Sequence, residues 1–190
     1  KSNAYLREEV YEAFKKMYEA AQKDGLRLVI ISATRNRSYQ SGIWNRKWNS
    51  FGGEENTRAN RILQYSSMPG TSRHHWGTDF DIYDRDSLPQ GVSLQLEPWE
   101  YLTGHQQPFY AWLKHHLADF GFFFPYQEDR GGVACEPWHI SHRATAQSCL
   151  AQLTLEVLQQ QIQTSALFGK EVVLDNLESI YNQFITNISQ

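Results

Sequence analysis

Ser-Arg-His-His-Trp-Gly-Thr-Asp-Phe-Asp, at residues 72–81, and Glu-Pro-Trp-His, at residues 136–139, are the two stretches that decide the fold of this chain. Imidazole nitrogens and carboxylate oxygens are common zinc ligands, and a catalytic zinc keeps three protein ligands and one position for water. His74, Asp81 and His139 can supply that set. Glu136 would then take a proton from the metal-bound water, whose pKa zinc lowers to about 7. The two stretches therefore predict a zinc site equipped for hydrolysis.

The two stretches also resemble the signature of a known family. Ser-x-His-x-x-Gly-x-x-x-Asp followed by Glu-x-Trp-His is similar to the pattern of the VanY-type D-alanyl-D-alanine carboxypeptidases, zinc peptidases of bacterial peptidoglycan. The matching residues are Ser72, His74, Gly77, Asp81, Glu136, Trp138 and His139. The one departure inside the motif is Asp79, where many relatives have alanine. Alternate residues of a strand share a face, so geometry leaves both Asp79 and Asp81 as candidate ligands, and the family spacing selects Asp81.

Several residues around the motifs keep open interpretations. Asp79 either orients a ligand histidine by accepting its second ring proton or is a solvated carboxylate. His75 is expected to be structural or to support a ligand, because adjacent residues of an extended segment face opposite ways. In a regular strand Glu136 and His139 would also face opposite ways. The backbone around Pro137 must therefore bend if both are to reach one metal.

A further resemblance lies at Ser32-Ala33-Thr34-Arg35, followed by Gln40, since VanY-type relatives carry Ser-x-x-Arg at a strand end and a glutamine five residues later. An arginine fork matches a carboxylate in bidentate fashion and can stabilise an oxyanion. The resemblance implies that Arg35 binds the substrate and its transition state, which makes Arg35 catalytic together with Glu136. It implies assisting substrate contacts for Gln40 and Ser72.

Hydrophobic periodicity predicts the elements that surround the motifs. Helical spacing occurs in residues 5–24, 39–48, 60–65, 109–120, 144–163 and 171–188. Short apolar or alternating stretches predict strands in residues 26–32, 77–83 and 122–124. The resemblance implies an α+β fold of the Hedgehog/D,D-peptidase type, in which a small antiparallel sheet carries the zinc and helices pack around it. We expect one zinc peptidase domain over residues 1–190, with residues 144–190 as a helical C-terminal extension.

Composition restricts the kinds of partner. The chain has 190 residues, of which 41% are hydrophobic, enough for one sizeable core. Its formal net charge of -3 lacks the basic footprint of a nucleic-acid-binding domain. No run of about 18 apolar residues is present, so no membrane span is expected. The apolar faces of the C-terminal helices are expected to pack within a monomer, with a homodimer through these helices as the alternative.

The two cysteines, Cys135 and Cys149, flank the second motif. We expect two free thiols, with a disulfide in an oxidising compartment as the alternative. Peptidoglycan is trimmed in the bacterial envelope and recycled in the cytoplasm. The periplasmic envelope is the expected compartment, and a cytoplasmic role in recycling is the alternative.

The family resemblance implies a function. It implies a Zn²⁺-dependent carboxypeptidase that removes a C-terminal D-amino acid, D-alanine, from peptidoglycan stem peptides or muropeptides, with D,D or L,D specificity left open. The alternatives are a peptidoglycan endopeptidase and a non-catalytic zinc module that binds a peptide or partner protein. A structural zinc usually has four protein ligands and needs no base, so Glu136 argues against the binding module.

Overall fold

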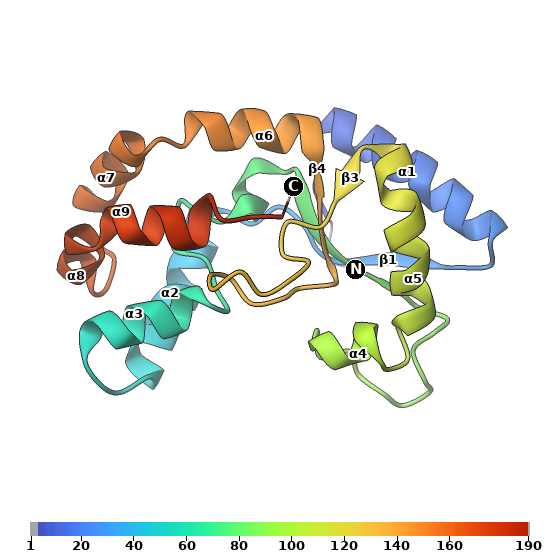
Figure 1. The fold of residues 1–190 in the computed structure, drawn as a ribbon, viewed down its shortest axis with the longest axis horizontal. Coiled ribbons are helices and arrows are strands. Elements are labelled where there is room, and N and C mark those ends of the chain that lie inside the picture. Colours follow the sequence, from blue (N-terminus) through green and yellow to red (C-terminus); the bar gives the residue numbers. More distant parts are fainter. Residues whose placement is uncertain (1–3, 190) are drawn as a thin grey trace.

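A four-stranded antiparallel sheet lies at the centre of the computed structural model, which describes residues 4–189 (Figure 1). The sheet has the order β1-β2-β4-β3. Its strands are β1 (Leu28–Ser32), β2 (Asp79–Asp84), β3 (Phe122–Phe123) and β4 (His139–His142). Helices lie on both sides of the sheet in this view. This small antiparallel sheet with helices around it confirms the expected α+β fold.

Strand β2 has one apolar and one acidic face, as its alternating sequence predicts. Phe80 and Ile82 are fully buried in the core beneath the sheet. Asp79 and Asp81 face the other way, and Asp81 is paired with His139 across β2 and β4. The strand register therefore brings one residue from each of the two sequence motifs side by side.

The helices follow the predicted pattern with shifted boundaries. They are α1 (Glu8–Lys23), α2 (Arg37–Ser50), α3 (Glu55–Leu63), α4 (Pro98–Leu102), α5 (Gln107–His116), α6 (Arg143–Gln152), α7 (Leu155–Gln163), α8 (Lys170–Asp175) and α9 (Leu177–Ile180). Shorter helical turns are η1 (Arg73–Trp76), η2 (Leu117–Phe120) and η3 (Tyr181–Ile185). Both predicted C-terminal helices are divided. The first breaks at Leu153, after which Thr154 caps α7 by accepting the backbone N–H of Val157.

Helix α4 lies in a segment for which the sequence analysis predicts no element. Pro98 occupies a first-turn position, where its missing N–H costs nothing. Glu97 and Glu100 form a capping box around the helix start. These two local features stabilise a helix too short to show hydrophobic periodicity.

Buried apolar side chains form two clusters. The first, which we call the sheet core, combines the inner face of the sheet with α1, α4 and α5, and includes Val10, Met17, Phe80, Ile82, Tyr101, Phe109, Leu113 and Ile140. The second, the helical core, combines α2 and α3 with the C-terminal helices, and includes Trp44, Trp48, Ile62, Leu63, Leu158, Ile162, Val173, Leu177, Ile180 and Phe184. In Figure 1 the helices of the two cores lie on opposite sides of the strands, and α6 runs along one edge between them.

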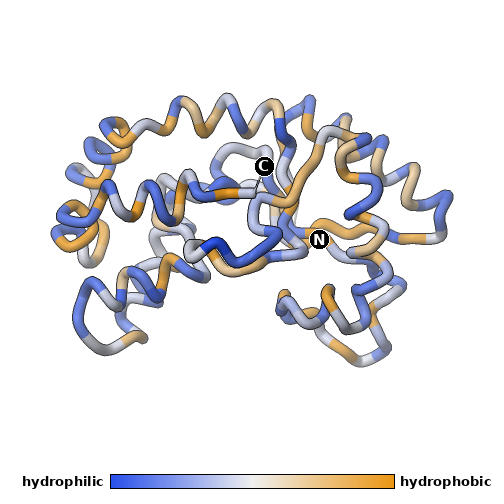
Figure 2. The backbone as a smooth tube through the Cα atoms, in the orientation of Figure 1, coloured by the Kyte–Doolittle hydropathy of each residue, from blue (hydrophilic) through white to orange (hydrophobic). Residues whose placement is uncertain are grey.

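The colouring in Figure 2 shows hydrophobic stretches in the strands, whereas most helices alternate between hydrophilic and hydrophobic residues. This alternation is what a helix with one buried face requires. The apolar faces of α7, α8 and α9 are thus covered by α2 and α3 of the same chain. Within residues 4–189, no helix is both long enough and apolar enough to cross a membrane.

Candidate metal site

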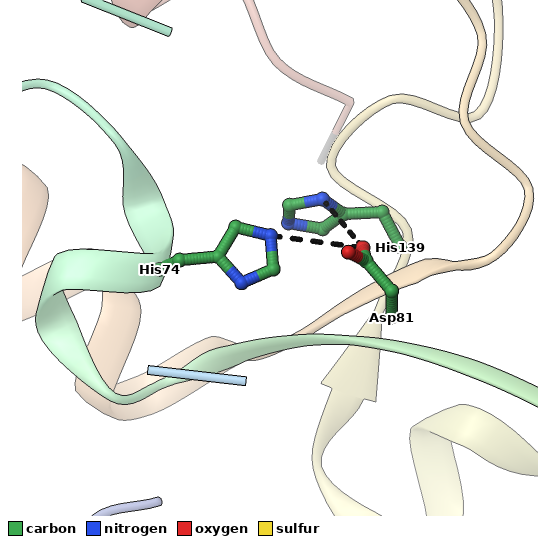
Figure 3. Close-up of side chains that lie close together, drawn as sticks. All are labelled: His74, Asp81 and His139. Carbon is green, nitrogen blue, oxygen red and sulfur yellow. Dashed lines mark ion pairs between the residues drawn. The ribbon is translucent and has the colours of Figure 1, made fainter. Parts of the chain in front are cut away.

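Three buried side chains from three different elements converge beside the sheet (Figure 3). His74 comes from η1, Asp81 from β2 and His139 from the start of β4, and one ligand atom of each lies within 4.8 Å of the others. His74 Nε2 is 3.6 Å and His139 Nδ1 is 3.5 Å from Asp81 Oδ1. Asp81 Oδ1 is buried and has no hydrogen-bond partner among residues 4–189. A buried carboxylate oxygen that accepts no hydrogen bond and faces two imidazole nitrogens fits zinc well.

The outer nitrogens of both histidines have partners that determine where the ring protons lie. His74 Nδ1 is 2.9 Å from the carbonyl oxygen of Ala33, which can only accept, so this nitrogen carries a proton. His139 Nε2 is 3.0 Å from Asp79 Oδ1. Each ring is therefore held on its outer side, while its other nitrogen faces Asp81. This is the arrangement that metal-binding histidines require.

The site concentrates negative charge around His139. Burial favours a lower pKa for His139, but hydrogen bonds to Asp79 and Glu136 and the charge of Asp81 outweigh it and raise the pKa to about 9. Burial raises the pKa of Asp81 to about 6, with a further contribution from Glu136. Burial, with the charges of His139 and Arg35, holds the pKa of His74 well below its usual value. A proton on His139 offsets part of this charge, and a metal cation would compete with it.

Glu136 reaches the same place through a turn. The backbone N–H of His139 donates to the Glu136 carbonyl over 3.1 Å, and β4 begins only at His139. Glu136 Oε2 consequently lies 3.1 Å from His139 Nδ1, and its side chain is 20% exposed. The bend that the sequence analysis requires around Pro137 is therefore present. The carboxylate is beside the candidate ligands and still open to solvent.

The loop that carries Glu136 is hydrogen-bonded to elements that form the helical core. Ala134 N–H donates to the Gln64 carbonyl at the end of α3 over 2.9 Å. Earlier in the loop, the Gly131 carbonyl accepts a hydrogen bond from Gln183 Nε2 over 2.6 Å. Asn187 Nδ2 donates to the Arg130 carbonyl over 2.9 Å. The end of α3, η3 and the residues that follow η3 thus hold the segment that presents the candidate base.

Arg35 follows the end of β1 and points toward the candidate ligands. Its Nη2 is 3.5 Å from Asp81 Oδ2, and its side chain is 25% exposed. Its Nη1 donates to Gln40 Oε1 over 3.5 Å. Gln40 is fully buried, and its Nε2 donates to the Ser67 carbonyl over 2.7 Å. The structure therefore shows Gln40 supporting Arg35, while a direct contact between Gln40 and substrate stays a prediction.

Ser72 lines a small cavity of about 70 Å³ together with Arg35, His74, Glu136 and His139. His75 faces away from it. The Nδ1 atom of His75 is 2.7 Å from the Arg35 carbonyl, and its Nε2 accepts the Gly70 N–H over 3.2 Å. His75 thus fixes the backbone beside Arg35, which is the structural role expected for it.

Lys47, for which the sequence predicts no role, lines a cavity of about 380 Å³ beside Glu136, and Tyr65 lines the same cavity. Burial lowers the pKa of the Lys47 ammonium. A signal was available, because Lys47 follows Gln40 by two helical turns and so lies on the same face of α2. Cys135 and Cys149 are free thiols, as expected.

Comparison with known proteins identifies the family. The family model of the D-alanyl-D-alanine carboxypeptidase VanY matches residues 3–145, a range that includes all candidate site residues. An uncharacterized protein of Haemophilus influenzae is 39% identical over 121 residues, which cover 62% of this chain and 92% of that protein.

Solved structures share the fold at low sequence identity. The L,D-carboxypeptidase LdcB has a TM-score of 0.60 and 21% identity, with 96% of this chain and 72% of LdcB covered. A mutant of the vancomycin resistance D,D-pentapeptidase VanY, in complex with Zn(II), has a TM-score of 0.55 and 20% identity, with 88% and 83% covered. The family match spans both motifs and the strands that bring them together, and the chain belongs to the VanY family of D-alanyl-D-alanine carboxypeptidases.

Proposed function

We propose that this protein is a zinc-dependent carboxypeptidase that removes the C-terminal D-alanine from peptidoglycan stem peptides. The observation that carries the proposal is the convergence of His74, Asp81 and His139 around a buried carboxylate oxygen that accepts no hydrogen bond, with Glu136 alongside. Family membership and the zinc complex of a relative support it. A zinc ion held by these three residues would polarise the scissile carbonyl and make a water molecule more acidic.

The residues of the chain then have separate tasks. Glu136 is placed to take a proton from the attacking water and to return it to the leaving amine, because its carboxylate is next to the ligands and partly exposed. Arg35 is placed to bind the terminal carboxylate of the substrate or the oxyanion that forms. Gln40 steadies Arg35, and Ser72 lines the cavity between Arg35 and Glu136.

An endopeptidase is the second candidate, because the site has open space on two sides. A cavity of about 490 Å³ runs along β1 to Arg35 and Asp81, and the cavity of about 380 Å³ lies beyond Glu136. Leu96 borders both cavities. A peptide that continues past the scissile bond has room on either side. For either reaction we propose peptidoglycan peptides as substrates and the bacterial envelope as the compartment.

The test uses three substrates with the zinc-loaded protein and a chelated control: a stem pentapeptide, a stem tetrapeptide and a cross-linked dimer of stem peptides, with products identified by mass. Loss of one D-alanine from the pentapeptide indicates a D,D-carboxypeptidase, and loss from the tetrapeptide an L,D-carboxypeptidase. Cleavage of the dimer alone indicates the endopeptidase. Absence of chelator-sensitive hydrolysis with all three would overturn the enzymatic proposal.

A matched pair of variants tests the mechanism. Glu136→Gln should abolish turnover and leave zinc binding in place. Glu128→Gln is the control, because Glu128 is an exposed carboxylate of the same loop, paired with Arg130 at the surface. It should retain full turnover. Activity in Glu136→Gln at the level of the control would exclude Glu136 as the base.

A further inference from the structure

Asp79, the residue at which the first motif departs from its relatives, lies at the centre of a buried polar cluster. It is 0% exposed, which excludes a solvated carboxylate. Arg73 Nε donates to its Oδ1 over 2.7 Å, and the hydroxyls of Thr78 and Ser141 donate to its Oδ2. His139 Nε2 completes the set at 3.0 Å from Oδ1. A buried carboxylate of this kind is stable only when its oxygens are fully paired.

The direction of every hydrogen bond in this cluster follows from the groups involved. A guanidinium can only donate, so Arg73 Nη2 donates to Ser141 Oγ over 2.8 Å. The Ser141 hydroxyl proton is then free to bond Asp79 Oδ2 at 3.0 Å. Both Asp79 oxygens act as acceptors, and the bond to His139 requires a proton on Nε2 of that ring. The Nδ1 atom is left as the nitrogen that faces Asp81 and Glu136.

The cluster also connects the three chain segments that carry the candidate ligands. Arg73 is adjacent to His74 in η1. In the β2–β4 ladder, the pair Asp79 and Ser141 lies two positions from the pair Asp81 and His139 and therefore on the same face of the sheet. Each ligand segment therefore contributes one member of the cluster.

Arg73 is fixed in its turn by packing. It is 3% exposed, and its guanidinium lies over the ring of Trp76, 4.9 Å from the centroid, with the Phe123 ring at 5.8 Å. These ring contacts hold the donor side of the cluster against Asp79.

We propose that Asp79 is a positioning residue, which with Arg73 and Ser141 orients the His139 ring and holds the three ligand segments in place for the metal. The proposal rests on the proposed function to the extent that zinc is the metal. Partners that orient a ligand histidine typically contribute about 10- to 100-fold to metal affinity.

The main test is the double variant Arg73→Met/Asp79→Ala. It removes both buried charges together, because the single change Asp79→Ala would leave Arg73 buried without a partner. The control is Asp84→Asn, which alters another buried carboxylate of β2. Asp84 accepts the Arg27 N–H and the Ser87 hydroxyl and has no contact with His139. Zinc affinity is measured by competition with a chromophoric chelator, and the ligand geometry by the visible absorption spectrum of the Co²⁺-loaded protein.

The double variant should bind zinc about 10- to 100-fold more weakly than the wild-type chain and should show an altered Co²⁺ spectrum, whereas Asp84→Asn should match the wild-type chain in both. Wild-type affinity and spectrum in the folded double variant would overturn the proposal. If the wild-type chain itself binds no zinc, the proposed function fails. Zinc binding without hydrolysis of stem peptides would contradict the proposed function and leave this inference standing.

A milder pair keeps the test decisive should the double variant not fold. Ser141→Ala removes one hydroxyl donor from Asp79, and Ser87→Ala removes the equivalent donor from Asp84. Ser141→Ala should weaken zinc binding several-fold and shift the Co²⁺ spectrum, and Ser87→Ala should do neither. Equal behaviour of the two serine variants would overturn the proposal.

Discussion

The sheet core and the helical core meet at the candidate site and supply it with different groups. The sheet core lies under β2 and β4, which carry Asp81 and His139. The helical core lies under α2, which carries Gln40. Gln183 of η3 and Asn187, just after η3, hold the loop that ends in Glu136. We therefore expect metal binding to depend mainly on the sheet core, and the positions of Glu136 and Gln40 to depend mainly on the helical core. Damage to the sheet half should weaken metal binding, whereas damage to the helical half should slow turnover by a site that still binds zinc.

The largest effect is expected from one large truncation in each core. Phe80→Ala and Trp44→Ala both remove a fully buried aromatic side chain, and each should lower the free energy of unfolding by about 3–5 kcal/mol. Phe80 lies between Asp79 and Asp81, so its loss should also weaken zinc binding. Trp44 lies one turn from Gln40, so its loss should lower turnover at saturating zinc. Denaturant unfolding measures the free energy of unfolding, chelator competition measures zinc binding, and steady-state rates measure turnover. Equal weakening of zinc binding in the two variants would contradict the expectation that metal binding depends on the sheet core.

A second prediction concerns the C-terminal helices. Leu158 on α7 is 0% exposed in the helical core, and its neighbour Val157 is 39% exposed. Leu158→Ala should destabilise the protein by about 2–5 kcal/mol, because it leaves a cavity, whereas Val157→Ala should stay within about 0.5 kcal/mol. Thermal unfolding of both variants decides the matter. A loss below about 1 kcal/mol for Leu158→Ala would mean that these helices contribute little to the core.

The sheet half should also show a distinctive pH dependence. His139 has an ordinary pKa of 6.5 and a folded pKa of about 9, so the fold binds its proton more tightly than the unfolded chain does. The resulting stability is complete below about pH 6.5 and is lost as the pH rises through 9, amounting to at most about 3 kcal/mol. Chelator-treated protein should therefore melt at lower temperature as the pH rises over this range.

Zinc affinity should rise over the same pH range, because the metal replaces a proton on His139. In Leu158→Ala, which changes only the helical core, the melting temperature and the zinc affinity should change with pH as they do in the wild-type chain. A melting temperature of chelator-treated protein that rises from pH 6.5 to 9 would contradict this account of His139.

The smallest effect is expected at the hydrogen bonds between Asn187 and the loop that ends in Glu136. Asn187→Ala removes the hydrogen bonds of Asn187 with the Arg130 carbonyl and side chain, each worth about 0.5–1.5 kcal/mol. Turnover should fall a few-fold, while zinc affinity stays unchanged, since no ligand lies on this loop. Steady-state rates at saturating zinc give the first quantity and chelator competition the second. A change in zinc affinity without a change in turnover would contradict this prediction, because it would mean that the helical core controls metal binding.

The sequence predicts the sheet half well because its signals are local. The alternation of β2 separates Phe80 from Asp81, and fixed spacing inside each motif identifies the residues that the structure brings together. Arg73 and Ser141 could not be identified in this way, because they occupy unspecified positions. Ser141 meets Asp79 through the strand register, and Arg73 meets both through the packing of η1 against the sheet. The turn at Pro137 contains a backbone hydrogen bond from the His139 N–H to the Glu136 carbonyl. The residue types in this segment do not predict such a bond.

The helical half was harder to predict because its contacts are distant in sequence. Trp44 Nε1 donates to the carbonyl of Phe168, 124 residues away, and no local pattern shows which apolar faces meet. The break between α6 and α7 was also hidden, since Leu153 continues the helical periodicity and Thr154 reveals its capping role only in the fold. Periodicity thus predicted that these helices exist but not that they complete a core with α2 and α3.

The pairing of Asp81 with His139 across β2 and β4 has a consequence for how this protein can change over generations. The distance between the two residues is set by the strand ladder and is independent of the number of residues that connect the strands. Insertions or deletions in exposed turns between residues 85 and 120 can reshape the walls around the substrate without disturbing the ligands. One extra residue inside β2 would turn Asp81 to the opposite face. Tolerance to changes in length should therefore fall abruptly at the ends of these two strands.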